Sequence, residues 1–367
     1  MKIKKIELKN YRNYEKLKLD FFDDLNIIYG NNGSGKTNIV EAIYILALTK
    51  SFRTNNDQNL IKIGTDFASV SAEIEKKDKE KFKIEIFKEG KCVYYNDDKV
   101  KKISDYITKI NVVLFNPLDV KIYNDSPSMR RKLLNVEISQ INKEYLMLLS
   151  NYNKLLKNRN IYLKQMHING NSSMEYINIL TNKLIEYGLK INNIRENYIE
   201  MINSNISQIY KNIFGYGELT VKYESFYNNK TKEELIAFYK KNLIKELSFG
   251  KTLYGINRDD IKFILDKKLL KDFGSIGQQK NAFIAFKLSE IIIIKKKTGE
   301  YPILILDDLF SELDDIKINN IITMLNKEVQ TFITTTDIDK INKKLIKNSI
   351  IYYIDNASVQ RRDIYEQ

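Results

Sequence analysis

A glycine-rich segment near the start of the chain has the residue types that hold a row of phosphates. Residues 30–37 read Gly-Asn-Asn-Gly-Ser-Gly-Lys-Thr and fit the P-loop pattern G-x-x-x-x-G-K-[ST]. The apolar stretch Leu25–Tyr29 precedes the loop as a buried strand would, and a helix is expected from about Thr37. Successive backbone N–H groups can then surround phosphate oxygens at a helix N-terminus. The segment predicts an ATP site, against the alternative of a chance glycine-rich turn.

Two side chains of this loop have predicted chemical roles. Lys36 is expected to reach the β- and γ-phosphates, and the Thr37 hydroxyl is expected to ligate Mg²⁺. The residues that the motif predicts to bind the nucleotide are Gly30, Asn31, Asn32, Gly33, Ser34, Gly35, Lys36 and Thr37.

A second acidic motif lies near the other end of the chain. Residues 302–308 read Pro-Ile-Leu-Ile-Leu-Asp-Asp, which is typical of a buried strand followed by two carboxylates, the Walker B pattern. Asp307 is expected to hold Mg²⁺, and Asp308 is expected to act as the general base that polarises the attacking water. Small GTPases and kinases place this strand much closer to the P-loop, so the wide separation favours an ATPase of the ABC type.

Three further segments favour the same class. Residues 274–279, Gly-Ser-Ile-Gly-Gln-Gln, precede an expected helix and are similar to the ABC signature, although alone they could be only a helix cap. Residues 311–314 are similar to the D-loop. Residues 331–336 form an expected last strand, with hydroxyls where ABC proteins sense the γ-phosphate. The predicted nucleotide-contacting residues in these segments are Ser275, Gly277, Gln278 and Thr335.

The elements that must position these motifs follow an α/β pattern. The first hundred residues contain several runs with the period of strands, and the period becomes helical from about Pro127. A long apolar stripe from Leu180 to Ile213 predicts helix packing in an antiparallel bundle, with an extended coiled coil as the alternative. The expected architecture is an ABC-type P-loop ATPase head split between residues 1–120 and 258–367, with a mostly helical inserted lobe at 121–257.

The composition restricts the class of protein further. Sixty Lys and Arg against 47 Asp and Glu give a net charge of +13, which favours an anionic partner, unless the lysines are only solvated. One Cys and one His cannot build a tetrahedral metal site or an internal disulfide. No apolar run approaches the length of a signal segment or of a membrane span, so a cytoplasmic protein without a membrane partner is expected.

Along nearly its whole length the chain resembles the RecF family of bacterial recombination mediators. The similarity includes the P-loop with Asn38 after it, which adds Asn38 to the nucleotide-contacting residues, and the Walker B and D-loop segments. Other segments that carry it are residues 8–14, 50–54, 115–119, 126–131, 156–160, 255–260 and 275–279. The resemblance implies an ATP-dependent homodimer that binds single-stranded and gapped or junction DNA, works with RecO and RecR, and supports replication and SOS induction. Its slow hydrolysis would release the DNA.

This chain departs from the family pattern at three places. The family usually has His-Arg at residues 52–53, Gly-Pro-His-Arg-Asp-Asp at 255–260 and Ser-Gln-Gly-Gln-Gln at 275–279, where this chain has Phe-Arg, Gly-Ile-Asn-Arg-Asp-Asp and Ser-Ile-Gly-Gln-Gln. Each change removes a polar or rigid group at the expected dimer seam. The changes concern hydrolysis and dimer closure more than ATP binding, because the P-loop and Asp307 are intact.

Basic residues on the expected helices are candidates for contacts with DNA phosphates, with a solvated helix face as the alternative. The residues named on this ground are Arg130, Arg131, Lys157 and Arg159.

Two other kinds of ATPase are alternatives that the sequence favours less. An SMC-like ATPase would carry a coiled-coil insertion far longer than the one expected here. A nucleotide-binding subunit of an ABC transporter would carry the full LSGGQ signature and a switch histidine, which this chain lacks.

Overall fold

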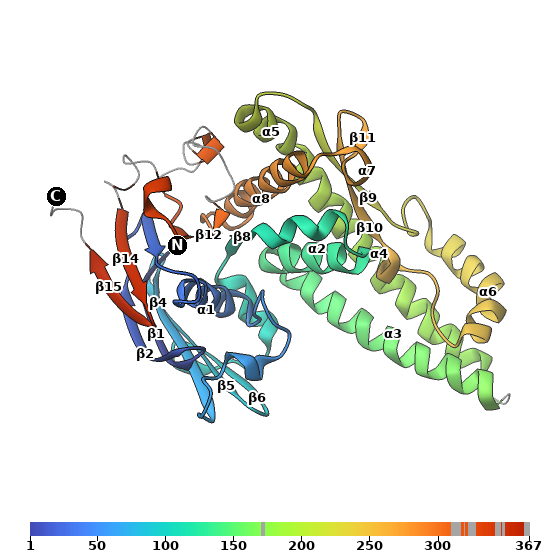
Figure 1. Cartoon of the computed structure of the whole chain (residues 1–367). Coiled ribbons are helices and arrows are strands. Elements are labelled where there is room, and N and C mark those ends of the chain that lie inside the picture. The colour runs from blue at the N-terminus through green and yellow to red at the C-terminus, as the bar shows by residue number, and fades with distance from the viewer. Residues whose placement is uncertain are drawn as a thin grey trace. The chain divides into compact units, whose positions relative to one another are not determined.

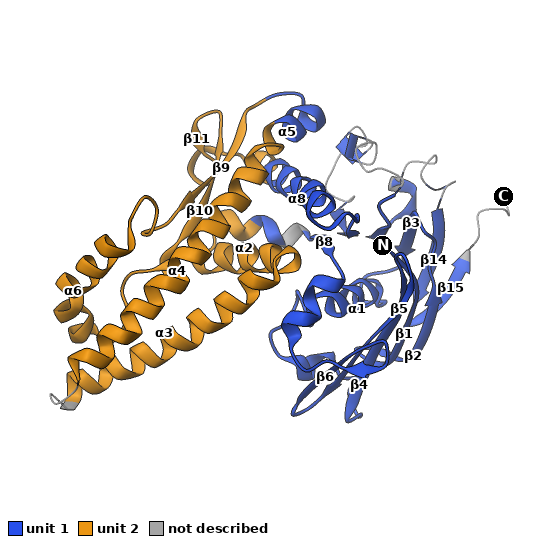
Figure 2. Cartoon of the chain, turned by 180° about the vertical axis from the view of Figure 1, so that it is seen from behind, with its two compact units in different colours: residues 1–120, 208–216, 280–367 blue, residues 121–207, 217–279 orange. Residues whose placement is uncertain are grey.

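The computed structural model describes residues 1–169, 173–309, 317–318, 320–321, 328–341, 346 and 349–362. The chain divides into two compact units, which Figure 2 shows in separate colours. Unit 1 comprises Met1–Val120, Gln208–Tyr216 and Lys280–Gln367, and unit 2 comprises Lys121–Ser207 and Gly217–Gln279. No helix in the described part of the chain is long and apolar enough to cross a membrane.

This division differs from the predicted domains in two places. Residues 258–279 were expected in the ATPase head but belong to unit 2, because β10 (Asp260–Leu265) pairs antiparallel with β9 (Leu219–Glu224) of that unit. Conversely, α5 (Ile206–Phe214) falls mostly in unit 1, where its Ile213 carbonyl accepts a hydrogen bond from Asn320. The predicted D-loop, residues 311–314, lies outside the described residues.

One sheet of unit 1 carries the P-loop and the acidic motif at its strand ends. Its order is β15-β14-β3-β13-β12-β8, with β15 antiparallel to β14 and every other pair parallel. The side chains of β8, β12 and β13 are buried along their whole length, as expected for parallel strands covered on both faces. The strands are β3 (Leu25–Tyr29), β8 (Val112–Phe115), β12 (Ile303–Asp307), β13 (Thr331–Thr335), β14 (Ser349–Asp355) and β15 (Ser358–Arg362).

The second sheet of unit 1 is antiparallel, with the order β2-β1-β4-β5-β6-β7. Its strands alternate buried and exposed residues, most regularly in β4, so one face packs on the core and the other meets solvent. The strands are β1 (Lys2–Tyr11), β2 (Tyr14–Asp20), β4 (Phe67–Glu75), β5 (Lys79–Phe87), β6 (Gly90–Tyr95) and β7 (Asp98–Lys99).

Helix α1 (Lys36–Leu48) packs against both sheets of unit 1, as the blue ribbon of Figure 1 shows. It contacts β8, β12 and β13 of the parallel sheet as well as β4 and β5 of the antiparallel sheet. Residues on every side of the helix are therefore buried, which explains why its apolar side chains follow no narrow stripe.

Unit 2 contains a helical bundle and a small sheet of order β11-β10-β9. Helix α4 packs against α3 and α6, with buried residues at intervals of three and four such as Ile177, Leu180 and Leu184. The bundle interpretation is confirmed for the part of the apolar stripe that lies on α4; the rest of the stripe, from Ile206 to Ile213, lies on α5, which falls mostly in unit 1. The other elements of unit 2 are α2 (Pro127–Ile141), α3 (Lys143–Asn169), α4 (Met174–Asn203), α6 (Lys232–Phe249), α7 (Leu270–Phe273) and β11 (Lys268–Leu269). Helix α8 (Ile276–Thr298) begins in unit 2 and continues from Lys280 in unit 1.

Candidate nucleotide-binding site

The loop between β3 and α1 has a backbone that only glycine can adopt. Gly35 has φ +118°, and a Cβ there would lie 2.7 Å from the Tyr14 hydroxyl oxygen. At Gly30 a Cβ would lie 2.1 Å from the Ile354 carbonyl oxygen. Gly30 and Gly35 are thus required by close contacts with β14 and β2 as well as by the turn itself.

Neighbouring segments hold the loop from outside. The Ser34 carbonyl accepts hydrogen bonds from the Ala357 N–H (3.1 Å) and from the Asn13 amide (3.3 Å). Asn38 in turn donates to Asn13 (2.7 Å). The side chains of Asn31 and Asn32 are exposed, at the part of the loop that faces solvent.

Lys36 lies inside the loop. Its ammonium group donates to the carbonyls of Gly30 (2.8 Å) and Asn31 (2.9 Å), and the residue is only 4% exposed. Burial lowers the pKa of Lys36, and the nearby carboxylates of Asp308 and Asp307 oppose that shift. The loop therefore holds a positive charge at its centre, the position that a phosphate chain requires.

The parallel sheet brings the two predicted Mg²⁺ ligands together. β13 pairs with β3 on one side and β12 on the other, so the P-loop and the acidic motif leave the same sheet edge. The Thr37 hydroxyl donates to Asp307 Oδ1 at 3.2 Å. A hydroxyl and a carboxylate at this separation are the oxygen donors that Mg²⁺ takes beside nucleotide phosphates, so the residues fit the ion.

Asp307 and Asp308 differ in backbone and surroundings. Thr334 donates its hydroxyl proton to Asp307 Oδ1 (2.6 Å) and accepts from the Asp308 N–H (3.0 Å). Asp308 has φ +51°, in the left-handed region that residues other than glycine seldom adopt and that is enriched at functional sites. Burial raises the pKa of both carboxyls; Asp308 further raises that of Asp307, and Lys36 opposes the shift at Asp308.

Thr334, next to the predicted nucleotide-contacting Thr335, is the threonine beside the acids. The Thr335 hydroxyl donates to the Asp337 carbonyl (2.9 Å) and accepts from the Asp337 N–H (3.1 Å) within a turn, and its contact with the γ-phosphate stays a prediction. Thr334 is the residue that contacts Asp307.

A buried glutamate, for which the sequence alone indicates no role, organises the start of α1. Glu41 is fully buried and binds the Arg12 guanidinium through two hydrogen bonds (2.6 and 2.8 Å). It also accepts from the Ser51 hydroxyl (2.5 Å) and lies 3.7 Å from Arg53, whose guanidinium donates to Asn38 (2.8 Å). Two cations are thereby fixed beside the predicted phosphate site. The only feature of the sequence that could have indicated these two arginines is that they lie in segments 8–14 and 50–54, which resemble the RecF family.

The signature-like segment belongs to unit 2 and caps α8. The Ser275 hydroxyl accepts from the Gln278 N–H (3.2 Å), and the Gln278 side chain accepts from the Ser275 N–H (2.9 Å), a capping box. The segment therefore caps α8 and leaves Ser275 and Gly277 exposed, and their contact with nucleotide stays a prediction. Ile276, which replaces a glutamine of the family pattern, is 71% exposed.

Two of the four predicted DNA contacts must be corrected. The Arg130 guanidinium is buried and forms two hydrogen bonds with Asp260 (2.6 and 2.9 Å). Arg159 is fully buried between Glu246 (2.6 Å) and the hydroxyl of Thr252 (2.7 Å). Both charges are neutralised inside unit 2, so neither can neutralise a phosphate.

The other two predicted DNA contacts remain at the surface to different degrees. Arg131 is half-buried and donates to the Asp259 carbonyl (2.7 Å). Lys157 is exposed.

Replacing Arg159 by alanine is expected to destabilise the protein by about 3–5 kcal/mol, because the Glu246 carboxylate would stay buried without its partner. Urea unfolding measures this change. Lys157→Ala, two residues away on the exposed face, should change stability by less than about 0.5 kcal/mol. If the Arg159→Ala protein unfolds like the wild type but binds DNA more weakly, the original prediction that Arg159 contacts DNA phosphates is correct.

Comparison with known proteins identifies the family. Residues 2–360 match the family model of the RecF/RecN/SMC N terminal domain. The DNA replication and repair protein RecF of Lactobacillus johnsonii is 37% identical, over 99% of this chain and 100% of its own length. That of Bacillus thuringiensis is 39% identical over 98% of each chain. The chain belongs to the RecF family.

Solved RecF structures have the same fold. The recombination mediator protein RecF with ATP, in the RecFOR pathway, superposes with a TM-score of 0.90 at 31% identity, covering 99% of this chain and 98% of that one. An Smc head bound to the C-winged helix domain of ScpA matches with a TM-score of 0.58 at 16% identity and shares the fold alone. The predicted α/β class, a P-loop ATPase head with a helical lobe, is confirmed.

Proposed function

We propose that this RecF-family chain is an ATP-dependent DNA-binding protein of recombinational repair and replication, in which ATP controls dimerisation and slow hydrolysis controls release. One observation carries the proposal: Thr37 and Asp307, from opposite ends of the chain, meet at 3.2 Å beside the buried ammonium of Lys36. The names of the relatives, DNA replication and repair proteins, support the biological role, and a relative solved with ATP supports the nucleotide.

The roles of the residues follow from their positions. Lys36 binds the β- and γ-phosphates, which replace the carbonyl partners that it has in the loop. Thr37 and Asp307 would hold Mg²⁺, which would neutralise charge that develops on the phosphates. Asp308 orients the attacking water and accepts its proton, a role favoured by the burial that raises the pKa of this carboxyl.

Dimerisation is proposed to use the exposed signature segment. Ser275 and Gly277 present a hydroxyl and a backbone to solvent, next to Phe273 and Ile276, which are 70% and 71% exposed. Exposed apolar side chains beside polar contact groups are typical of protein interfaces. A second protomer that carries ATP would cover these residues, so the signature of one copy meets the P-loop of the other.

DNA is the proposed ligand of the dimer, in single-stranded, gapped or junction form. The net charge of +13 supports a phosphate-rich partner.

RecO and RecR are the proposed protein partners, since a solved relative acts in the RecFOR pathway. SOS induction follows from the same role. The ATPase is expected to be weak and to depend on DNA, because it times release and performs no mechanical work.

Analytical sedimentation with gapped duplex DNA, with and without ATP and Mg²⁺, tests this function. We expect a dimer only with the nucleotide, and a DNA complex whose affinity falls by about a thousandfold between 50 and 200 mM salt if several phosphates are contacted. A protein that binds ATP but forms neither dimer nor DNA complex would contradict the proposal. ATP affinity, measured separately, distinguishes that result from a defective nucleotide site.

A further inference from the structure

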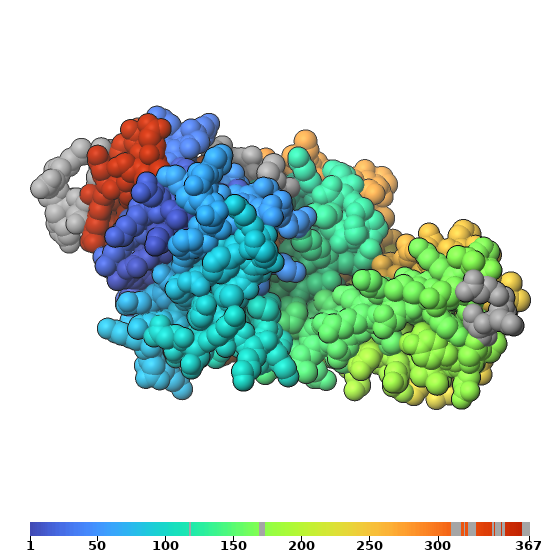
Figure 3. Space-filling view, turned by 90° about the horizontal axis from the view of Figure 1, so that it is seen from below, coloured from blue at the N-terminus to red at the C-terminus, as the bar shows by residue number. Residues whose placement is uncertain are grey.

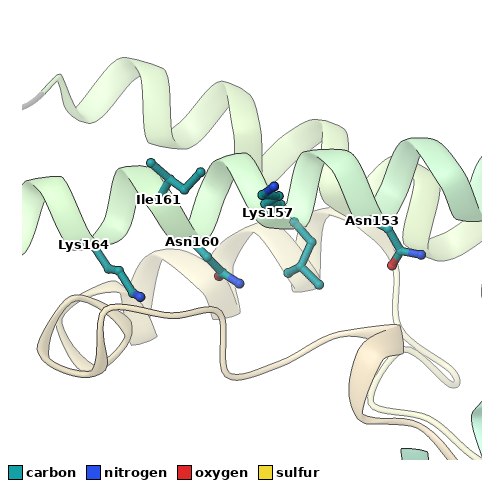
Figure 4. A pocket seen from close by; sticks show the side chains of 6 residues that line it. Asn153, Lys157, Asn160, Ile161 and Lys164 are labelled. Atoms are coloured by element: carbon teal, nitrogen blue, oxygen red, sulfur yellow. The ribbon is translucent and has the colours of Figure 1, made fainter. Parts of the chain in front are cut away.

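Helix α3 carries a groove on its exposed side, in unit 2 and outside the nucleotide site. The groove has a volume of about 360 Å³ and a mostly apolar wall. Figure 4 shows Asn153, Asn160 and Lys164 pointing to the same side of α3. The residues that line it are Asn153, Leu156, Lys157, Asn160, Ile161 and Lys164.

The chain that follows α6 runs beside this groove. The Thr252 N–H donates to the Asn160 side chain at 2.8 Å. A Cβ on Gly250 would lie 3.1 Å from Lys164 Cγ, so Gly250 and the neighbouring Lys251 lie beside Lys164. Figure 3 shows the outer surface of this bundle, with the green residues of α3 and α4 near the yellow residues of α6.

The exposed charged side chains of the two chain segments beside the groove are all basic. Residues 145–169 of α3 contain no Asp or Glu, and residues 235–254 contain only Glu246, which is buried against Arg159. No acidic side chain among the described residues forms an ion pair with Lys157 or Lys164. The exposed lysines of the two segments are Lys154, Lys157, Lys164, Lys240, Lys241, Lys245 and Lys251.

Apolar side chains are exposed within the same region. Ile161, a lining residue, is 47% exposed, and Phe249, directly before Gly250, is 58% exposed. The aliphatic stems of Lys157 and Lys164 extend this apolar surface while their ammonium groups stay in water. Nucleic-acid phosphates would satisfy the charge but not the apolar wall, whereas a protein segment with both acidic and apolar residues would satisfy both.

We propose that this groove is the docking site of an acidic amphipathic segment of a protein partner. Apolar side chains of the segment pack on Leu156 and Ile161, and its carboxylates pair with Lys157 and Lys164. Asn153 to Lys164 span about 17 Å of helix, which matches about five residues of extended peptide. This docking role replaces the phosphate contact predicted for Lys157. Binding of the segment does not require ATP.

Fluorescence anisotropy with a labelled short peptide of alternating acidic and apolar residues tests the proposal, without nucleotide. We expect Lys157→Glu/Lys164→Glu to weaken binding at least about tenfold, because two attractions become repulsions, and Ile161→Ser to weaken it several-fold. The matched control, Lys183→Glu/Lys190→Glu, reverses two exposed lysines of α4 and should bind like the wild type. Thermal unfolding confirms that each variant is folded.

Three outcomes would overturn the proposal. The first is no binding of the acidic peptide to the wild-type protein. The second is equal binding of oligoglutamate, which has the charge without the apolar residues. The third is that Lys157→Glu/Lys164→Glu abolishes binding of a single-stranded oligonucleotide and leaves the peptide unaffected, which would assign the groove to nucleic acid.

Discussion

Lys36→Met is expected to lower ATP affinity by about a hundredfold and to abolish ATP-dependent dimerisation and DNA binding. The ammonium is the only charge placed inside the P-loop, and charged hydrogen bonds contribute up to about 3 kcal/mol each, which corresponds to that factor. The fold should be retained, because methionine keeps the length of the buried stem. Titration with a fluorescent ATP analogue and sedimentation with gapped DNA measure the two effects.

The matched control is Lys297→Met, which makes the same substitution at an exposed lysine of α8 in unit 1. This protein should bind ATP and DNA like the wild type. If the Lys36→Met protein still forms a dimer with ATP, the proposal that dimerisation depends on phosphate binding by Lys36 is wrong.

Asp308→Asn is expected to slow ATP hydrolysis by about 10²–10⁴-fold while ATP affinity changes little. The substitution removes the base that accepts a proton from water, and a general base contributes a factor of that size. Asparagine tolerates the left-handed φ of +51° at this position, so the backbone should not move. Phosphate release in single turnover measures the rate. The dimer and its DNA complex should persist longer, because hydrolysis is the step that releases them.

Asp307→Asn provides the contrast, because this residue meets Thr37 and is expected to hold Mg²⁺. Its loss should weaken ATP binding in the presence of Mg²⁺ and leave Mg²⁺-independent binding unchanged. If Asp308→Asn hydrolyses ATP at the wild-type rate, another group activates the water, and the assignment of the base is wrong.

The nucleotide site was predictable because its signals are local. The glycine spacing with Lys36 and Thr37 fixes the loop, and an apolar run ending in Asp307 fixes the acidic strand. The parallel pairing of both strands with β13 then brings the two ends together. Local patterns were enough to predict this site, because each motif directly follows a strand and both strands end at the same edge of the sheet.

Burial of the basic residues was not predictable in the same way. Arg159 and Lys157 are two positions apart on one helix, yet one is fully buried and the other is exposed. The difference depends on Glu246 in α6, which is 87 residues away in the chain. No periodicity in α3 indicates which face another helix will cover.

Strand β13 shows a second limit. Thr334 and Thr335 are both buried, because the sheet is covered on both faces. Because both faces of β13 are buried, its sequence does not alternate between polar and apolar residues. The sequence therefore does not show which threonine lies on the face toward Asp307. For this reason it did not indicate that Thr334 is the threonine that contacts Asp307.

The neighbours of β3 also determine when the site can exist during synthesis. β3 leaves the ribosome early, but both strands that flank it, β13 and β14, come from residues 331–355, and the Ala357 N–H that holds Ser34 follows them. A nascent chain that lacks these residues has a P-loop sequence on an unpaired strand. The loop can therefore reach the conformation that holds phosphate only after residues 331–357 have been synthesised and have paired with β3.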